Sequence, residues 1–211
     1  MTRGKFLFVQ NAWGDPPPAL AMIRGHRFDV FQQYEIDRLD WSEYDAVYLS
    51  MSVDQIHLVE IAPKIEAYLD GGGALVVNGH VARPFLPELR RYEPMPRRGL
   101  AELRLRRENE HPMFEGVSAE TLTLRRGVAG FYGRGSNPPP EGALVIHSVG
   151  PDRVAVDWLW ERPGGGRIFA HAGVELLAVL MLEGPEQGLP ALQRIFDWLA
   201  ATSGLPAREA A

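Results

Sequence analysis

A strand–helix–strand block between residues 44 and 80 restricts the fold of this chain more than any other stretch. Residues 45–51 contain the apolar run Val47-Tyr-Leu49, residues 54–69 place apolar side chains at mostly helical spacing, and residues 74–77 form a second apolar run after three glycines. Strands that read as continuous apolar runs are covered on both faces, as in parallel sheets. The block therefore predicts a layered α/β fold.

Further elements are predicted on both sides of this block. The expected strands are 5–9, 28–32, 143–147, 154–160 and 167–170, and the expected helices are 19–24, 174–182 and 189–202. Leu103 with Leu105, and Leu122 with Leu124, alternate with polar residues, which predicts half-exposed strands. We expect a flavodoxin-like three-layer sandwich with a mostly parallel central sheet. An antiparallel β excursion should interrupt it in the middle of the chain, before the last strand returns to the sheet.

Composition limits the number of domains and the kinds of partner. The chain has 211 residues, 45% of them hydrophobic, which is enough for one large core. We expect a single domain over residues 1–205 and a flexible tail at 206–211. The formal charge of −5 gives no general attraction to nucleic acid or anionic lipid, and no apolar run approaches the roughly 18 residues of a membrane span. We therefore expect a cytoplasmic protein without nucleic-acid or membrane partners, while assembly into a homo-oligomer stays open.

The chain contains no cysteine. This excludes disulfides, thiolate metal sites and a cysteine nucleophile. The commonest chemistry of an α/β strand-end turn is therefore missing.

Three stretches carry a resemblance to a known superfamily. They are Val77-Asn-Gly-His80, His111-Pro-Met-Phe-Glu-Gly-Val117, and the pair 155–162 and 164–171, in which a Gly-Arg-apolar strand ends at His171. In this order they resemble the class I glutamine amidotransferase-like superfamily, and within it the ThuA-like (trehalose utilisation) branch. The resemblance implies a strand-to-helix turn of the form Cys-x-Gly-His at residues 77–80.

The departures from this pattern decide the chemistry. The position of the nucleophile holds Val77, or Asn78 if the alignment shifts by one residue, and neither can attack an amide. We therefore expect no amidotransferase activity. The resemblance also implies a late histidine held by a glutamate, which His171 and Glu175 could supply as an orienting pair, although Glu175 could equally be an exposed helix residue.

Several candidate site residues follow the predicted parallel strands, where α/β proteins bind their ligands. His80 could transfer a proton or bind a ligand, or could hydrogen-bond its own turn, and Arg83 could hold a carboxylate or phosphate, or only solvate the surface. Asn78 and Gly79 either shape the turn or contact the ligand. Trp13, Asp15 and Ser52 complete the set, with Trp13 either stacking on a sugar or packing in the core.

The sequence predicts no metal and no cofactor. His80 and His171 could meet a carboxylate of Asp15, Asp54 or Glu175, but no local metal-ligand spacing supports such a site. No glycine-rich segment opens a helix as phosphate-binding loops do. The other four histidines are interpreted as structural; they are His26, His57, His111 and His147.

Three functions remain open. The first is a non-amidotransferase protein that binds a small polar molecule, with carbohydrates as candidates, at the C-terminal edge of the sheet. The second is a ThuA-like enzyme acting on a sugar derivative, with His80 or His171 as acid or base. The third is a non-catalytic interaction or assembly module, since a fold can outlast its chemistry.

Overall fold

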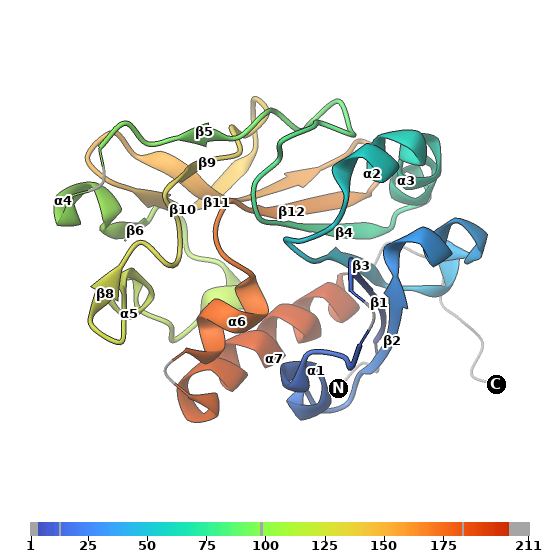
Figure 1. The fold of residues 1–211 in the computed structure, drawn as a ribbon, viewed down its shortest axis with the longest axis horizontal. Coiled ribbons are helices and arrows are strands. Elements are labelled where there is room, and N and C mark those ends of the chain that lie inside the picture. Colours follow the sequence, from blue (N-terminus) through green and yellow to red (C-terminus); the bar gives the residue numbers. More distant parts are fainter. Residues whose placement is uncertain (1–3, 13, 98, 183, 203–211) are drawn as a thin grey trace.

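One eight-stranded sheet organises the molecule (Figure 1). The computed structural model describes residues 4–12, 14–97, 99–182 and 184–202; the predicted tail at 206–211 lies outside them. In sheet order the strands are β2 (Arg27–Gln32), β1 (Lys5–Gln10), β3 (Ala46–Leu49), β4 (Ala74–Asn78), β12 (Arg167–His171), β11 (Val154–Glu161), β10 (Leu144–Val149) and β6 (Leu105–Arg107). The first five strands are parallel, and the last three are added antiparallel. The predicted α/β class is confirmed.

Strand β4 lies in the middle of the parallel part. It pairs with β3 on one side and with β12 on the other, so the last strand does return to the main sheet. All five of its residues are buried. Burial on both faces explains why this segment is an unbroken apolar run.

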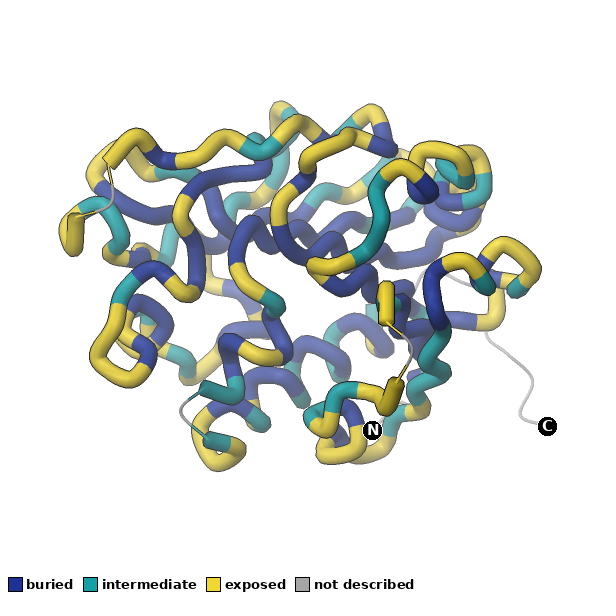
Figure 2. The backbone as a smooth tube through the Cα atoms, viewed as in Figure 1, coloured by how far each residue is buried: buried dark blue, intermediate teal, exposed yellow. Residues whose placement is uncertain are grey.

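Helices cover both faces of the sheet (Figure 1). One core lies between the sheet and three helices, α1 (Pro18–Met22), α6 (Leu176–Met181) and α7 (Pro185–Ala201). A second core lies on the other face, under α2 (Gln55–Glu60) and α3 (Ala62–Asp70). Figure 2 shows the buried sheet between these exposed outer layers. The three-layer arrangement is thus built from two apolar clusters that share the sheet.

Two helices differ from their predicted extents. The helix expected over 54–69 is broken at Ile61, because Pro63 lies in the first turn of α3 and has no N–H to continue a helix that begins before it. Helix α7 begins at Pro185, four residues before the predicted start, and runs through Pro190. Its apolar face continues across the proline, since Gly188 and Ala191 are buried together.

The antiparallel excursion contains short elements. They are β5 (Glu93–Pro94) paired with β9 (Gly135–Ser136), β7 (Leu124–Arg125) paired with β8 (Val128–Ala129), and the helices α4 (Leu100–Leu103) and α5 (Ala119–Thr123). The strand predicted at Leu122 and Leu124 is wrong at Leu122, which lies in α5, whereas Leu124 does lie in strand β7. Ser118 caps a helix there by accepting a hydrogen bond from the N–H of Thr121.

Short 3₁₀ turns complete the chain at Gln33–Arg38, Trp41–Glu43 and Pro112–Phe114. Across the described part of the chain, every helix is too short or too polar to cross a bilayer.

Candidate functional site

The turn that ends β4 is shaped by a glycine. Gly79 has φ +88°, and a Cβ added there would lie 2.7 Å from the Cβ of Met51. Only glycine adopts this conformation and tolerates this contact without strain. Asn78, one residue earlier, is 4% exposed and accepts a hydrogen bond from the N–H of Leu176 at 3.0 Å. The Nδ2 of Asn78 is buried without an acceptor among the described residues.

His80 follows this turn and is exposed. One face of its ring stacks on Tyr92, with 3.6 Å between ring centroids and 15° between planes. Burial of the ring lowers the pKa of His80, and the nearby charge of His171 lowers it further. Within the described ranges, neither ring nitrogen of His80 has a hydrogen-bond partner, so a neutral imidazole is available at this edge of the sheet.

The loop after His80 is held by Gln55, at the start of α2. The side-chain amide of Gln55 donates to the carbonyl of His80 at 2.7 Å and accepts from the backbone N–H groups of Ala82 and Arg83 at 2.8 and 2.9 Å. The predicted residue Arg83 is exposed beside the turn. The loop therefore has a fixed start, which places Arg83 near His80.

A row of buried polar side chains runs across four strands. The Nε of Arg107 (β6) donates to Nε2 of His147 (β10) at 2.9 Å, and Nδ1 of His147 lies 2.6 Å from Oδ2 of Asp157 (β11). The other oxygen of Asp157 lies 2.6 Å from Nδ1 of His171 (β12). Both histidines and Asp157 are 0% exposed. Among these residues the sequence had singled out only His171 as functional.

The hydrogen-bond partners fix the protons of this row. Arg107 can only donate, so Nε2 of His147 must accept and its proton lies on Nδ1. The Nε2 of His171 faces the carbonyl of Val174 at 3.0 Å, which can only accept. His171 therefore donates from both nitrogens when Asp157 is a carboxylate, and the two form a buried imidazolium–carboxylate pair.

The electrostatics of Asp157 agree with this assignment. Burial opposes ionisation of the carboxyl, but the charge of His171 and the hydrogen bonds from His147 and His171 hold its pKa well below the usual range. The hydroxyl of Tyr132 adds a third donor at 2.8 Å. Burial, together with the charge of Asp157, raises the pKa of Tyr132 well above its ordinary value. Asp157 is thus a carboxylate whose acceptor positions are occupied.

An irregular strand pairing brings His147 and Asp157 together. Between β10 and β11 the register shifts on each side of His147, leaving first Ile146 and then Val156 without a regular partner. Such a bulge turns consecutive side chains toward one face of the sheet. Here it points the side chain of Asp157 toward the same apolar cluster as Val156.

His171 and Glu175 have different partners and do not act as the predicted orienting pair. The chain turns after β12 at Gly173, where a Cβ would lie 1.9 Å from the carbonyl of Tyr132. Glu175 then accepts hydrogen bonds from the Tyr48 hydroxyl and, at 2.9 Å, from the N–H of Met51. Glu175 therefore fastens the start of α6 to the end of β3.

The remaining predicted residues do not converge into one cluster. Ser52 is exposed after β3, and its hydroxyl lies 3.2 Å from that of Ser50. Asp15 is exposed before α1, and no described hydrogen bond or ion pair joins it to the turn at Gly79. Trp13 lies outside the described residues. The structure thus brings together Asn78, Gly79, His80 and Arg83.

In residues 4–12, 14–97, 99–182 and 184–202, no three histidine or carboxylate side chains are close enough together to hold a metal ion. The imidazole of His171 is occupied by Asp157 and Val174.

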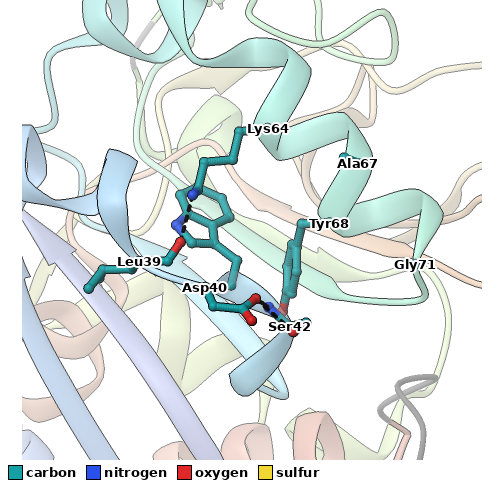
Figure 3. A pocket seen from close by; sticks show the side chains of 8 residues that line it. Leu39, Asp40, Ser42, Lys64, Ala67, Tyr68 and Gly71 are labelled. Carbon is teal, nitrogen blue, oxygen red and sulfur yellow. Dashed lines mark hydrogen bonds between the residues drawn. The ribbon is translucent and has the colours of Figure 1, made fainter.

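A cavity of about 350 Å³ lies at the opposite edge of the sheet, before β3 and β4 (Figure 3). Trp41 and Tyr68 are among the residues that line it. The polar groups around it serve the fold: Lys64 donates to the carbonyls of Asp37 and Leu39, and the Tyr68 hydroxyl donates to that of Tyr44. We place the candidate site at the end of β4 instead, because an unpaired imidazole is present there.

Comparison with known proteins supports the fold class. No family model and no curated protein sequence matches the chain. PurLQS from Thermotoga maritima superposes with a TM-score of 0.55 and 13% identity over 93% of this chain and 99% of that one. The mmIFT52 N-terminal domain gives a TM-score of 0.52 and 12% identity over 96% and 100%. The chain is therefore similar in fold to these two structures, and such identities speak to the fold alone.

Proposed function

We propose that this protein binds a small polar molecule at the C-terminal edge of its sheet and does not hydrolyse glutamine. The observation that carries the proposal is His80, an exposed imidazole without a protein partner in the described ranges, at the end of the central strand β4. Open α/β sheets bind ligands at the carboxyl ends of their strands.

The absence of amidotransferase chemistry follows from the residues at the turn. Val77 is buried in the core under α2 and α3, and Asn78 carries no nucleophilic atom. The ThuA-like enzyme remains the second candidate, with His80 as its acid or base, because His171 has both nitrogens engaged. Sugars and sugar acids are accordingly the first compounds to test.

Binding can be tested by soaking crystals with these compounds and by a thermal-shift screen of the same set. We expect at least one compound to raise the melting temperature of the wild type and to bind beside His80. His80→Ala should remove this shift, while Arg106→Gln, an exposed substitution on the distant strand β6, should leave it unchanged. If no compound shows binding that His80→Ala weakens, the site is elsewhere. Measurable glutaminase activity would contradict the rejection of amidotransfer.

A third candidate function is an interaction module. Leu100, Leu124, Val128 and Phe131 are 58%, 38%, 51% and 36% exposed, and all belong to the antiparallel excursion. Leu100 and Leu124 line one cavity of about 170 Å³ beside α4. Exposed apolar clusters often mark protein contacts. Light scattering should then reveal self-association that Leu100→Ser weakens and His80→Ala does not.

A further inference from the structure

The segment that follows the site turn carries unpaired positive charge. Arg83, Arg90, Arg91 and Arg97 are all exposed. In the described part of the chain none of their guanidinium groups forms an ion pair or a hydrogen bond, whereas Arg27, Arg38, Arg107, Arg153, Arg162 and Arg167 each face a carboxylate. This concentration is notable in a chain whose net charge is −5.

Acidic groups near the site are already engaged. Glu88 lies in the same segment, but its carboxylate is 2.7 Å from Nε of Arg162. The carboxylate of Glu175 accepts hydrogen bonds from the Tyr48 hydroxyl and the N–H of Met51. Glu93 is the one other acid between residues 81 and 97. The potential around the turn is therefore set mainly by the arginines.

The loop that carries Arg83, Arg90 and Arg91 is closed onto the site. The N–H of Tyr92 donates to the carbonyl of Val81 at 2.7 Å, and the Tyr92 ring stacks on His80. Gln55 fixes the start of the loop. Residues 82–91 thus form a loop with both ends held at His80, and Arg83, Arg90 and Arg91 lie within it.

We infer that the molecule bound at the Asn78–His80 turn is a small anion bearing a carboxylate or a phosphate, with the arginines of loop 82–91 as its counter-charges. The inference rests on the proposed function, because it assigns a ligand class to the same site. Guanidinium groups pair with both oxyanions through charge-assisted hydrogen bonds. The exposed ring of a neutral His80 supplies a hydrogen-bond donor that orients the ligand without adding charge.

Isothermal titration calorimetry of the full chain with three related probes tests this inference. Gluconate carries a carboxylate, glucose 6-phosphate carries a phosphate, and glucose carries neither. We expect one or both anions to bind roughly tenfold or more tightly than glucose, because a charge-assisted hydrogen bond contributes more than a neutral one. The difference between the two anions identifies the oxyanion preferred. Arg90→Gln/Arg91→Gln should weaken anion binding about tenfold, and Arg106→Gln, also exposed and unpaired, should not.

The outcomes separate the two claims. If glucose binds as tightly as the anions and His80→Ala abolishes binding while Arg90→Gln/Arg91→Gln does not, the site stands and the anion inference is overturned. If binding of the anions depends on the arginines but is unaffected by His80→Ala, the anions bind away from the turn. Both the proposed site at the turn and the anion as its ligand are then overturned. Equal losses in the Arg106→Gln control would indicate a general charge effect and would also overturn the inference. If none of the three probes binds, the inference that the site holds a small anion is contradicted.

Discussion

Asp157 is the residue on which the buried polar row depends. Its two oxygens accept from His147, His171 and Tyr132 at 2.6 to 2.8 Å. In Asp157→Asn, one oxygen is replaced by an NH₂ group that must face a donor, and the charge of His171 loses its counter-ion. Breaking a buried ion pair from one side costs about 3–5 kcal/mol. We expect urea denaturation to show a loss of that size in the free energy of unfolding.

Asp152→Asn is the matched control, since Asp152 is exposed in the turn after β10. It should change the free energy of unfolding by less than about 0.5 kcal/mol. A loss of under about 1 kcal/mol in Asp157→Asn would mean that the row tolerates a neutral group, and the imidazolium assignment of His171 would be wrong.

The same residue predicts a pH dependence in acid. The pKa of Asp157 is depressed in the folded state, so below about pH 4 the unfolded chain takes up this proton first. The stabilisation from Asp157 is therefore complete above about pH 4 and declines as the pH falls through the folded pKa. Unfolding curves between pH 5 and the acid limit should show a steeper loss in the wild type than in Asp157→Asn. Parallel curves would exclude Asp157 as a source of the slope.

His80 should also titrate, with a smaller effect on the free energy of unfolding. Its pKa is lowered by burial and by His171, so its NMR resonances should titrate with a midpoint below about 6.5. Below that pH the unfolded chain binds the proton first, so His80 subtracts from stability as the pH falls toward the folded pKa. Tyr92→Ala uncovers the ring and should raise the midpoint toward the ordinary value. An unchanged midpoint would show that the stack with Tyr92 does not set the pKa of His80.

The turn that follows strand β4 should require glycine at position 79. Gly79→Ala places a Cβ at positive φ and against Met51, and such strain costs about 1–3 kcal/mol. Gly71→Ala is the control, because φ there is −75° and the added Cβ would make only ordinary contacts at 3.4 Å. Thermal unfolding should separate the two variants by several degrees. Equal melting temperatures would show that the turn relaxes.

The elements that could be read from the sequence are those whose burial is uniform. Strand β4 and strand β3 are buried along their whole length, and each appears as an apolar run. Segment 119–123 forms a helix although its pattern alternates, because a short helix and a half-exposed strand can share such a pattern. The cap at Ser118 favours the helix. The break before α3 and the start of α7 are each marked by a proline in the first helical turn, Pro63 and Pro185, which the predicted bounds did not use.

Only part of the site could be predicted from the sequence. The turn at residues 78–80 follows a recognisable strand, so its location could be inferred. Asp157 is flanked by apolar residues in β11, and His147 stands with Ser148 inside the otherwise apolar β10, which was a usable signal for a buried polar pair. Their meeting depends on the bulge between β10 and β11, and no residue pattern showed that register shift.

The whole molecule joins a parallel and an antiparallel half through one core. The apolar cluster under α6 and α7 includes Phe8 of β1, Val76 of β4 and Ile146 of β10, which come from both halves of the sheet. The buried row from Arg107 to His171 crosses the junction between β11 and β12. Neither half can separate without exposing this shared surface and breaking the buried ion pair.

This continuity predicts that the chain unfolds as a single cooperative unit. Calorimetry should give one transition whose calorimetric and van't Hoff enthalpies agree. Amide exchange at Val76 and Ile146 should report the same free energy of opening, since their strands lie on opposite sides of the junction. Asp157→Asn should lower both values together, because Asp157 links the halves. Earlier exchange of Ile146, or a separate low-temperature transition, would show that the antiparallel strands form an independent unit and that the single domain predicted over residues 1–205 is wrong.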